Sequence, residues 1–191
     1  MAILIGLTGP PGVGKDAVAR HLENEHGFSR VAFADEIRRI AMVLNPCVGG
    51  CARLSEVVHD HGWDVAKQVW PDVRALLQRL GTEVGRQLFG DDIWITKVFD
   101  VVDGLPPSQP VVIPDTRFAN EAAVIRSRGG DLVRINRATK NPDAVMAHQS
   151  EVESAGLVAD YVITNDGTFA DLHRRLDQLV PRLQTPRRAH A

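Results

Sequence analysis

The feature that most constrains this fold is a glycine-rich segment that directly follows a short apolar run near the N-terminus. Residues 2–7 are apolar or small, Thr8 follows, and residues 9–15 read GPPGVGK, which fits the pattern G-x-x-x-x-G-K. An apolar run bounded by turn residues is typical of a buried parallel strand, and residues 14–25 continue with a helical pattern. Glycines let backbone N–H groups converge on phosphate oxygens, and a helix N-terminus favours anions. The segment therefore predicts a strand–loop–helix unit that binds phosphate.

The residues that we expect to bind ATP in this unit lie in the loop and the first helical turn. They are Gly9, Pro11, Gly12, Val13, Gly14, Lys15, Asp16 and Ala17. Lys15 brings a positive charge to the β- and γ-phosphates. Asp16 stands where the pattern usually has Ser or Thr, whose hydroxyl binds Mg²⁺. A carboxylate there can hold Mg²⁺ directly or through water, cap the helix, or pair with a basic residue.

Further apolar runs alternate with helical patterns along the chain. The predicted strands after the first are 31–34, 111–113, 132–135 and 161–164, and the predicted helices of this part are 36–44, 120–128 and 169–183. Between residues 47 and 109 we expect no strand, and helices at 54–61, 65–69, 73–88 and 93–102. Such alternation predicts an α/β fold with a parallel sheet, helices on both faces and a helical insertion. Ligands of such sheets bind at the carboxyl ends of the strands.

Composition narrows the classes of function. A chain of 191 residues suits one domain, and a net charge of −2 argues against a nucleic-acid polymer as partner. No apolar run approaches the 18 residues that a membrane-spanning helix needs, so we expect no membrane association. Two cysteines cannot form a disulfide scaffold, which favours a reducing, cytoplasmic location.

Four segments together resemble those of a known family. They are GKD at 14–16, VRALLQRLGTE at 73–83 with Trp94 downstream, VIPDTR at 112–117, and DYVITNDG at 160–167. Their order and spacing resemble the phage-type deoxynucleoside monophosphate kinases, a branch of the P-loop nucleotide kinases.

The resemblance implies a three-layer P-loop fold with a five-stranded parallel sheet and helices on both faces. It implies one kinase domain over residues 1–184, with an acceptor-binding helical region at about 35–109, a lid at about 136–150 and a flexible tail at 185–191. The implied reaction moves the γ-phosphoryl group of ATP, with Mg²⁺, to a deoxynucleoside monophosphate. Relatives suggest a homodimer, and a phage source would place the enzyme in the host cytoplasm.

Asp115 and Arg117 follow the third strand. Asp115 ends an apolar run, where a P-loop protein holds Mg²⁺ through water, and we expect it at the metal and substrate site. A helix N-cap is the alternative. Arg117 resembles the family's phosphate-binding arginine in Asp-x-Arg, and a surface ion pair is the alternative.

The helical insertion supplies the expected acceptor-binding residues. Arg74 occupies a position that the family uses to grip the acceptor phosphate, and a guanidinium suits that task. Gln78 lies at i+4 from Arg74, on the same helix face, and can touch the base or sugar. Thr82 and Arg86 also match relatives. For Arg79 and Arg86 a solvated helix face is the alternative.

Asp35 and Arg38 follow the second predicted strand and face the presumed acceptor site. Asp35 can orient a sugar hydroxyl or accept from the base, or it caps the helix that starts at Glu36.

The resemblance places Arg137 in the lid as the cation that reaches the transferring phosphoryl group, with Arg134 as the alternate. Lys140 and His148 belong to the same segment. Asn165 and Gly167 would lie along the adenine of ATP, mostly through backbone groups, unless they form an ordinary turn.

A last cluster consists of Cys47, Cys51, His59 and His61. These four side chains offer nitrogen and sulfur donors for Zn²⁺, but the spacing is no standard zinc motif. We interpret them as two free thiols and surface histidines.

Two alternatives to the nucleotide kinase remain. One is a related small-molecule kinase, with dephospho-coenzyme A as the nearest acceptor. The other is a non-catalytic nucleotide-binding module that kept the phosphate loop. The sequence does not distinguish the accepted base, nor deoxyribonucleotides from ribonucleotides.

Overall fold

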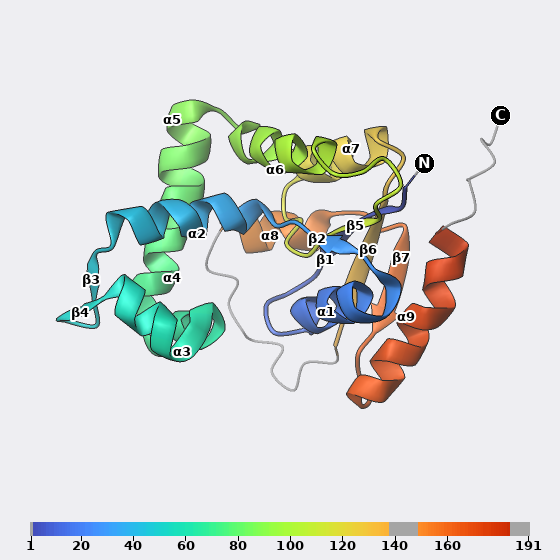
Figure 1. Ribbon diagram of the computed structural model, residues 1–191, viewed down its shortest axis with the longest axis horizontal. Helices are drawn as coiled ribbons and strands as arrows, with labels where there is room; N and C mark the ends of the chain where they lie inside the picture. The colour runs from blue at the N-terminus through green and yellow to red at the C-terminus, as the bar shows by residue number, and fades with distance from the viewer. Residues whose placement is uncertain (1, 138–148, 184–191) are drawn as a thin grey trace. The chain divides into compact units, whose positions relative to one another are not determined.

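The computed structural model describes residues 2–137 and 149–183, and these divide into two compact units. The core unit comprises residues 1–32 and 100–191, and the insertion unit comprises residues 33–99 (Figure 1). No helix among the described residues is long and apolar enough to span a membrane.

The core unit is built on a five-stranded sheet in the order β2-β5-β1-β6-β7. Its strands are β1 (Leu4–Thr8), β2 (Ser29–Arg30), β5 (Val111–Ile113), β6 (Asp131–Asn136) and β7 (Tyr161–Thr164). Every neighbouring pair is parallel, which confirms the predicted parallel sheet.

Helices cover both faces of this sheet (Figure 1). The helices of the core unit are α1 (Lys15–His26), α7 (Ala119–Ser127), α8 (Gln149–Gly156) and α9 (Phe169–Leu183). On one face Leu7 of β1 packs in a buried cluster with Leu22 of α1 and Leu172 of α9. The neighbouring Gly6 points the other way, where a Cβ would lie 2.7 Å from Cδ1 of Ile125 in α7. The alternation of side chains along β1 thus fixes which helix covers which face.

The prediction of a second strand at 31–34 is wrong. The strand β2 ends at Arg30, and helix α2 (Phe33–Leu44) begins three residues earlier than expected. Val31, Ala32 and Phe33 are all buried, and the Val31 amide still donates to Val112 O at 3.1 Å. The apolar run therefore reflects burial that continues from the end of β2 into the first turn of α2. The strand prediction was wrong because a short apolar run indicates burial but does not distinguish a strand from a helix.

The insertion unit is mostly helical. Its elements are α2, β3 (Cys47–Val48), β4 (Ala52–Arg53), α3 (Leu54–Val69), α4 (Pro71–Gln78), the π-helix η1 (Arg79–Arg86), α5 (Gln87–Phe89) and most of α6 (Ile93–Asp103). The expectation of no strand here is wrong, since β3 and β4 form an antiparallel hairpin. Gly62 has non-helical angles (φ 74°, ψ 163°) inside α3, which breaks this helix between the two helices predicted there.

The π-helix η1 lies inside the single helix that we predicted over 73–88. Trp94 gives a physical reason for it. Its indole Nε1 donates to Gly81 O at 2.7 Å, an oxygen that in an α-helix would accept from the amide of Gly85. The same indole lies so close to Gly85 that a Cβ there would come within 2.1 Å of Trp94 Cζ2. Two glycines and one tryptophan thus shape this helix, and π-helical turns often occur at functional sites.

We predict that Gly85→Ala lowers the free energy of unfolding by about 1–3 kcal/mol, because the added methyl group overlaps the Trp94 ring. Urea denaturation measures the change. Gly156→Ala is the matched control, since a Cβ at Gly156 meets nothing within 4 Å. Equal stability of the two variants would contradict this packing.

Candidate active site

The loop between β1 and α1 has the backbone that phosphate binding requires. Gly9, Gly12 and Gly14 have φ of 135°, 75° and 105°, a region that side-chain-bearing residues rarely adopt. At Gly9 space forbids a side chain as well, because a Cβ would lie 2.3 Å from Ile135 O. The predicted glycine-rich turn is therefore present at the carboxyl end of β1.

Lys15, the first residue of α1, folds back over this loop. Its Nζ donates to Gly9 O at 2.7 Å and to Pro10 O at 2.8 Å. These two carbonyls hold the ammonium group above the loop, where it can meet phosphate oxygens.

Asn165 anchors the loop from the end of β7. Its side chain is 5% exposed, and its Nδ2 donates to Val13 O at 2.9 Å. Its backbone amide donates to Asn136 O at 2.7 Å, which joins the ends of β6 and β7. A Cβ at Gly14 would lie 2.7 Å from the same Nδ2. The side chain of Asn165 thus holds the phosphate loop, a role that sequence reasoning missed, while the expected contact of its backbone with adenine stays a prediction.

Asp16 pairs with a basic residue, one of the three roles considered for it. Its Oδ1 lies 3.5 Å from Nη2 of Arg30, and about half of its side chain is exposed. The capping role is wrong, because the N-cap of α1 is Gly14 and no side chain caps this end. The negative charge in the first turn is favourable toward the helix dipole.

Asp115 and Arg117 follow β5, as expected. Asp115 is half-buried and Arg117 is exposed. The N-cap alternative for Asp115 is wrong, because the N-cap of α7 is Phe118. The carboxylate of Glu121, itself buried, accepts from the amides of Arg117 (2.8 Å) and Phe118 (3.0 Å). Glu121 therefore fixes the backbone beside Asp115.

Two buried threonines at the same edge of the sheet were missed by sequence reasoning. Thr8 ends β1, and the amide of Thr116 donates to Leu7 O at 3.1 Å. Among the described residues neither hydroxyl has a hydrogen-bond partner. Thr116 lies in the segment VIPDTR, but sequence reasoning gave neither threonine a role, because a threonine after an apolar run is also an ordinary strand end.

The two arginines considered for the lid differ in structure. Arg137 directly follows β6 and is exposed. Arg134 donates to Ser154 O at 3.0 Å and to Leu157 O, at the C-terminal end of α8, and therefore supports that helix end. Lys140 and His148, most of the predicted lid and the predicted tail lie outside the described residues.

Gly167, in the turn that follows β7, is exposed, and Asp171 stabilises the start of the helix α9 after it. The Asp171 carboxylate accepts from the amide (3.0 Å) and hydroxyl (2.7 Å) of Thr168, and these hydrogen bonds lower its pKa. The Asn-Asp-Gly segment thus leads into the capped N-terminus of α9.

The predicted acceptor-binding residues of the insertion unit differ in their exposure to solvent. Arg74 of α4 is exposed and Gln78 is half-buried, with Thr82 and Arg86 following in η1. Arg79 is exposed and pairs with Glu83, as on a solvated helix face. The side chain of Arg86 is only 10% exposed and lies 3.5 Å from Asp91, so the solvated alternative does not describe it.

Asp35 and Arg38 lie in the same helix and pair with each other at 3.1 Å. Asp35 does not cap α2, since this helix begins at Phe33. The guanidinium carbon of Arg38 also lies 6.0 Å from the centroid of the Trp63 ring, within cation–π range.

Cys47 and Cys51 are exposed free thiols. In the described part of the chain, the group of His, Cys, Asp or Glu side chains that converges closely enough for a metal ion consists of His21, His26 and Asp177. The cluster of Cys47, Cys51, His59 and His61 does not converge in this way.

Comparison with known proteins agrees with the geometry. The sequence pattern of a family described as deoxynucleotide monophosphate kinase matches residues 52–176, which is more than half of the chain. The chain belongs to this family. A protein of Acanthamoeba polyphaga mimivirus, named "Putative deoxynucleotide monophosphate kinase", is 26% identical over 193 residues, covering 91% of this chain and 94% of that protein. The resemblance seen in the sequence is confirmed, and the chain is a nucleotide monophosphate kinase.

Solved structures similar to this deoxynucleotide monophosphate kinase family member are more distant. A dephospho-CoA kinase from Campylobacter jejuni is 13% identical with a TM-score of 0.47, over 96% of this chain and 98% of that one. A shikimate kinase from Acinetobacter baumannii is 19% identical with a TM-score of 0.46, over 96% of each chain.

We predict that Asn165→Ala lowers the free energy of unfolding by about 1–3 kcal/mol, because Val13 O loses its buried donor. Asn165→Asp should cost more, since a carboxylate oxygen would then face that carbonyl. Thermal and urea denaturation measure both. Asn24→Ala, at an exposed position of α1, is the control and should change stability by less than about 0.5 kcal/mol. No difference between Asn165→Ala and this control would contradict the anchoring role.

Proposed function

We propose that this kinase transfers the γ-phosphoryl group of ATP to a deoxynucleoside 5′-monophosphate, which yields the deoxynucleoside diphosphate and ADP and serves dNTP supply. The observation that carries the proposal is the anchored phosphate loop with Lys15 on top of it, in a member of the deoxynucleotide monophosphate kinase family. A nucleotide-binding module without catalysis would not need this lysine together with the carboxylate and arginines that follow β5 and β6.

In the proposed step an oxygen of the acceptor phosphate attacks the γ-phosphorus. The bond from that phosphorus to the β–γ bridging oxygen breaks, and its electrons stay on ADP. The acceptor oxygen is already an anion, so the step needs no strong base. Catalysis then rests on positioning and on charge neutralisation, which we assign to Lys15, Arg74, Arg117 and Arg137.

The donor set at the carboxyl edge of the sheet fits Mg²⁺. Asp115 is half-buried and follows β5, the strand next to β1, and the Asp16 carboxylate lies 3.5 Å from Arg30. Carboxylate oxygens are the ligands that Mg²⁺ prefers. Bound Mg²⁺ neutralises charge on the phosphate oxygens; Asp16 and Asp115 would hold it, directly or through water.

For ATP we propose Gly9, residues 11–17 and, after β7, Asn165 and Gly167. For the acceptor we propose a larger set that is basic or hydrogen-bonding. It comprises Asp35, Arg38, Arg74, Gln78, Thr82, Arg86, Asp115 and Arg117. A homodimer stays a prediction, which sedimentation velocity tests.

The first test is ADP release across dTMP, dGMP, dCMP, dAMP and the ribonucleotides, with dephospho-coenzyme A as a further acceptor. We expect turnover with one or more deoxynucleotides. Lys15→Ala should lower kcat by a hundredfold or more, because no ammonium group would then neutralise the negative charge of the transferring phosphoryl group. Arg182→Ala, at an exposed position in α9, is the control and should leave kcat unchanged.

Preferred turnover of dephospho-coenzyme A would replace the proposal with the related kinase activity. A thermal shift with ATP but no turnover of any acceptor would indicate a non-catalytic module.

The second test concerns the acceptor side. Arg74→Ala should raise the KM for the deoxynucleotide by about 10- to 150-fold and leave the KM for ATP nearly unchanged, as expected for a lost charged hydrogen bond. Arg74→Lys should recover only part of this, because an ammonium lacks the bidentate geometry. Arg79→Ala is the matched control, since Arg79 is exposed and pairs with Glu83. An Arg74→Ala enzyme with unchanged kinetics would remove Arg74 from the acceptor site.

A further inference from the structure

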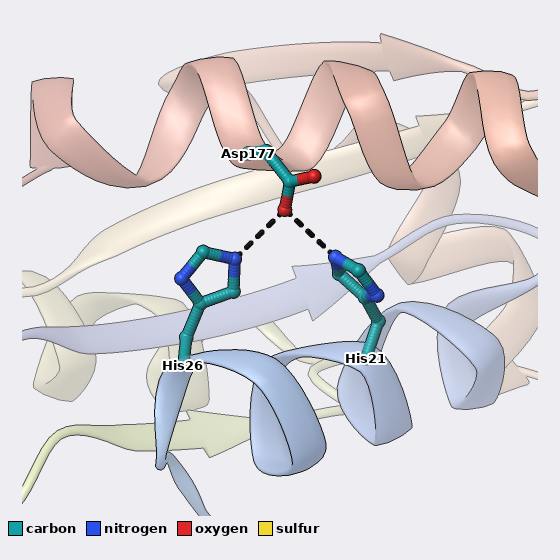
Figure 2. A group of neighbouring side chains, drawn as sticks. All are labelled: His21, His26 and Asp177. Carbon is teal, nitrogen blue, oxygen red and sulfur yellow. Dashed lines mark hydrogen bonds and ion pairs between the residues drawn. The ribbon is translucent and has the colours of Figure 1, made fainter.

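A second polar cluster lies between α1 and α9, on side chains that the proposed reaction does not use. Figure 2 shows His21 and His26 of α1 and Asp177 of α9 pointing toward one another. Each histidine has its Nε2 at 2.8 Å from the same atom, Oδ1 of Asp177. The three potential ligand atoms lie within 4.8 Å of one another.

We propose that Nε2 of His21, Nε2 of His26 and a carboxylate oxygen of Asp177 form a binding site for a divalent transition-metal ion, best matched by Zn²⁺. Two imidazoles and a carboxylate are a ligand set that zinc accepts, with bonds of about 2.0–2.2 Å. In a tetrahedral arrangement such bonds place the ligand atoms about 3.3 Å apart. The observed separation of 2.8 Å between each Nε2 and Oδ1 therefore has to open by only about half an ångström.

The helices hold these ligands in place. His26 is the last residue of α1, and the Cα–Cβ bonds of a helix tilt toward its N-terminus, so this side chain leans back toward His21. The ring of His173, one turn before Asp177 on α9, stacks on the ring of His21 with centroids 4.0 Å apart and planes at 17°. This stacking fixes the plane of the His21 imidazole.

The charges of the cluster also suit a cation. Both imidazoles direct Nε2 at the same oxygen of Asp177, whose carboxylate supplies the negative charge of the cluster. In the described part of the chain Asp177 forms ion pairs with these two histidines and with no arginine or lysine. A metal ion can replace the imidazole protons that face this carboxylate, because neutral imidazoles and a carboxylate are metal ligands.

The three side chains are exposed enough to let a metal ion enter and to leave room for a fourth ligand. The side chain of His21 is 10% exposed, that of His26 23% and that of Asp177 49%. Solvent can therefore reach the carboxylate side and supply a water as the fourth ligand. His21 and His26 lie about 9 Å and about 16 Å from Lys15 along the axis of α1. We therefore assign the ion a stabilising role, as a clasp between α1 and α9, and no role in phosphoryl transfer.

The experiment uses the full chain without an affinity tag, with Cys47→Ser and Cys51→Ser to remove competing exposed thiols. Calorimetric titration with Zn²⁺ should show one ion bound per chain. Titration with Co²⁺ should give the visible absorption of a four-coordinate site. At a hundredfold excess over Kd, Zn²⁺ should raise Tm by about 5–10 °C, while Mg²⁺ should not raise it.

Ligand variants decide the location. His21→Gln, His26→Gln and Asp177→Asn should each weaken Zn²⁺ binding by tenfold or more and abolish the Tm increase. His59→Gln is the matched control, since His59 is an exposed histidine outside the converging group, and it should change binding by less than about threefold. Circular dichroism of the metal-free variants verifies folding, and Asp177→Asn keeps an acceptor oxygen between the two helices.

The proposal is overturned if the parent chain binds no Zn²⁺, or if all three ligand variants bind it as the parent does. Neither result bears on the kinase activity, which the acceptor panel tests separately.

Discussion

The buried hydrogen bond from Asn165 to Val13 O is the contact on which the active site depends. Three glycines with positive φ give the phosphate loop its shape, and glycines also make a chain costly to order. Such a loop needs an anchor, and Asn165 supplies it from the end of the last strand, 152 residues away in the sequence. Because the same residue joins β6 to β7 through its amide, the loop is fixed to the sheet as a whole. The carbonyls of Gly9 and Pro10 in this anchored loop then orient the Lys15 ammonium group.

The insertion unit follows a different principle, in which one large ring determines the backbone. The indole of Trp94 donates a hydrogen bond to Gly81 O and fills the space beside Gly85, and the helix that contains both glycines is a π-helix. The first five residues of η1 belong to VRALLQRLGTE, one of the segments that carry the family resemblance. The wider turn of η1 changes the angular spacing of side chains after Gln78. Thr82 and Arg86 therefore do not continue the i+4 row of Arg74 as an α-helix would place them.

Several parts of this protein could be read from the sequence because they depend on local chemistry. The glycines of the loop, the closing helix at 169–183 and the apolar strands at 111–113 and 161–164 coincide with observed elements. The prediction of a second strand at 31–34 failed because Val31, Ala32 and Phe33 are buried for two different reasons, first beside β5 and then in the first turn of α2. The role of Asn165 and the cluster of His21, His26 and Asp177 had no sequence signal. The contacts of Asp177 with the two histidines and of Asn165 with Val13 O all join residues more than 150 positions apart. His21 and His26 alone, five positions apart on a helix, do not indicate a site without the third ligand from α9.

Sequence alone determined that this chain forms a phosphate-binding parallel α/β sheet with a helical insertion, because period, turn chemistry and glycine patterns act over a few residues. It also determined the family, since four ordered segments with correct spacing are specific in combination. Only the tertiary structure decided that Asp16 pairs with Arg30, that Glu121 rather than Asp115 holds the start of α7, and that Asn165 grips the loop. These choices depend on which side chains meet when strands and helices pack. A carboxylate or amide has several satisfactory partners in principle, and packing selects one of them.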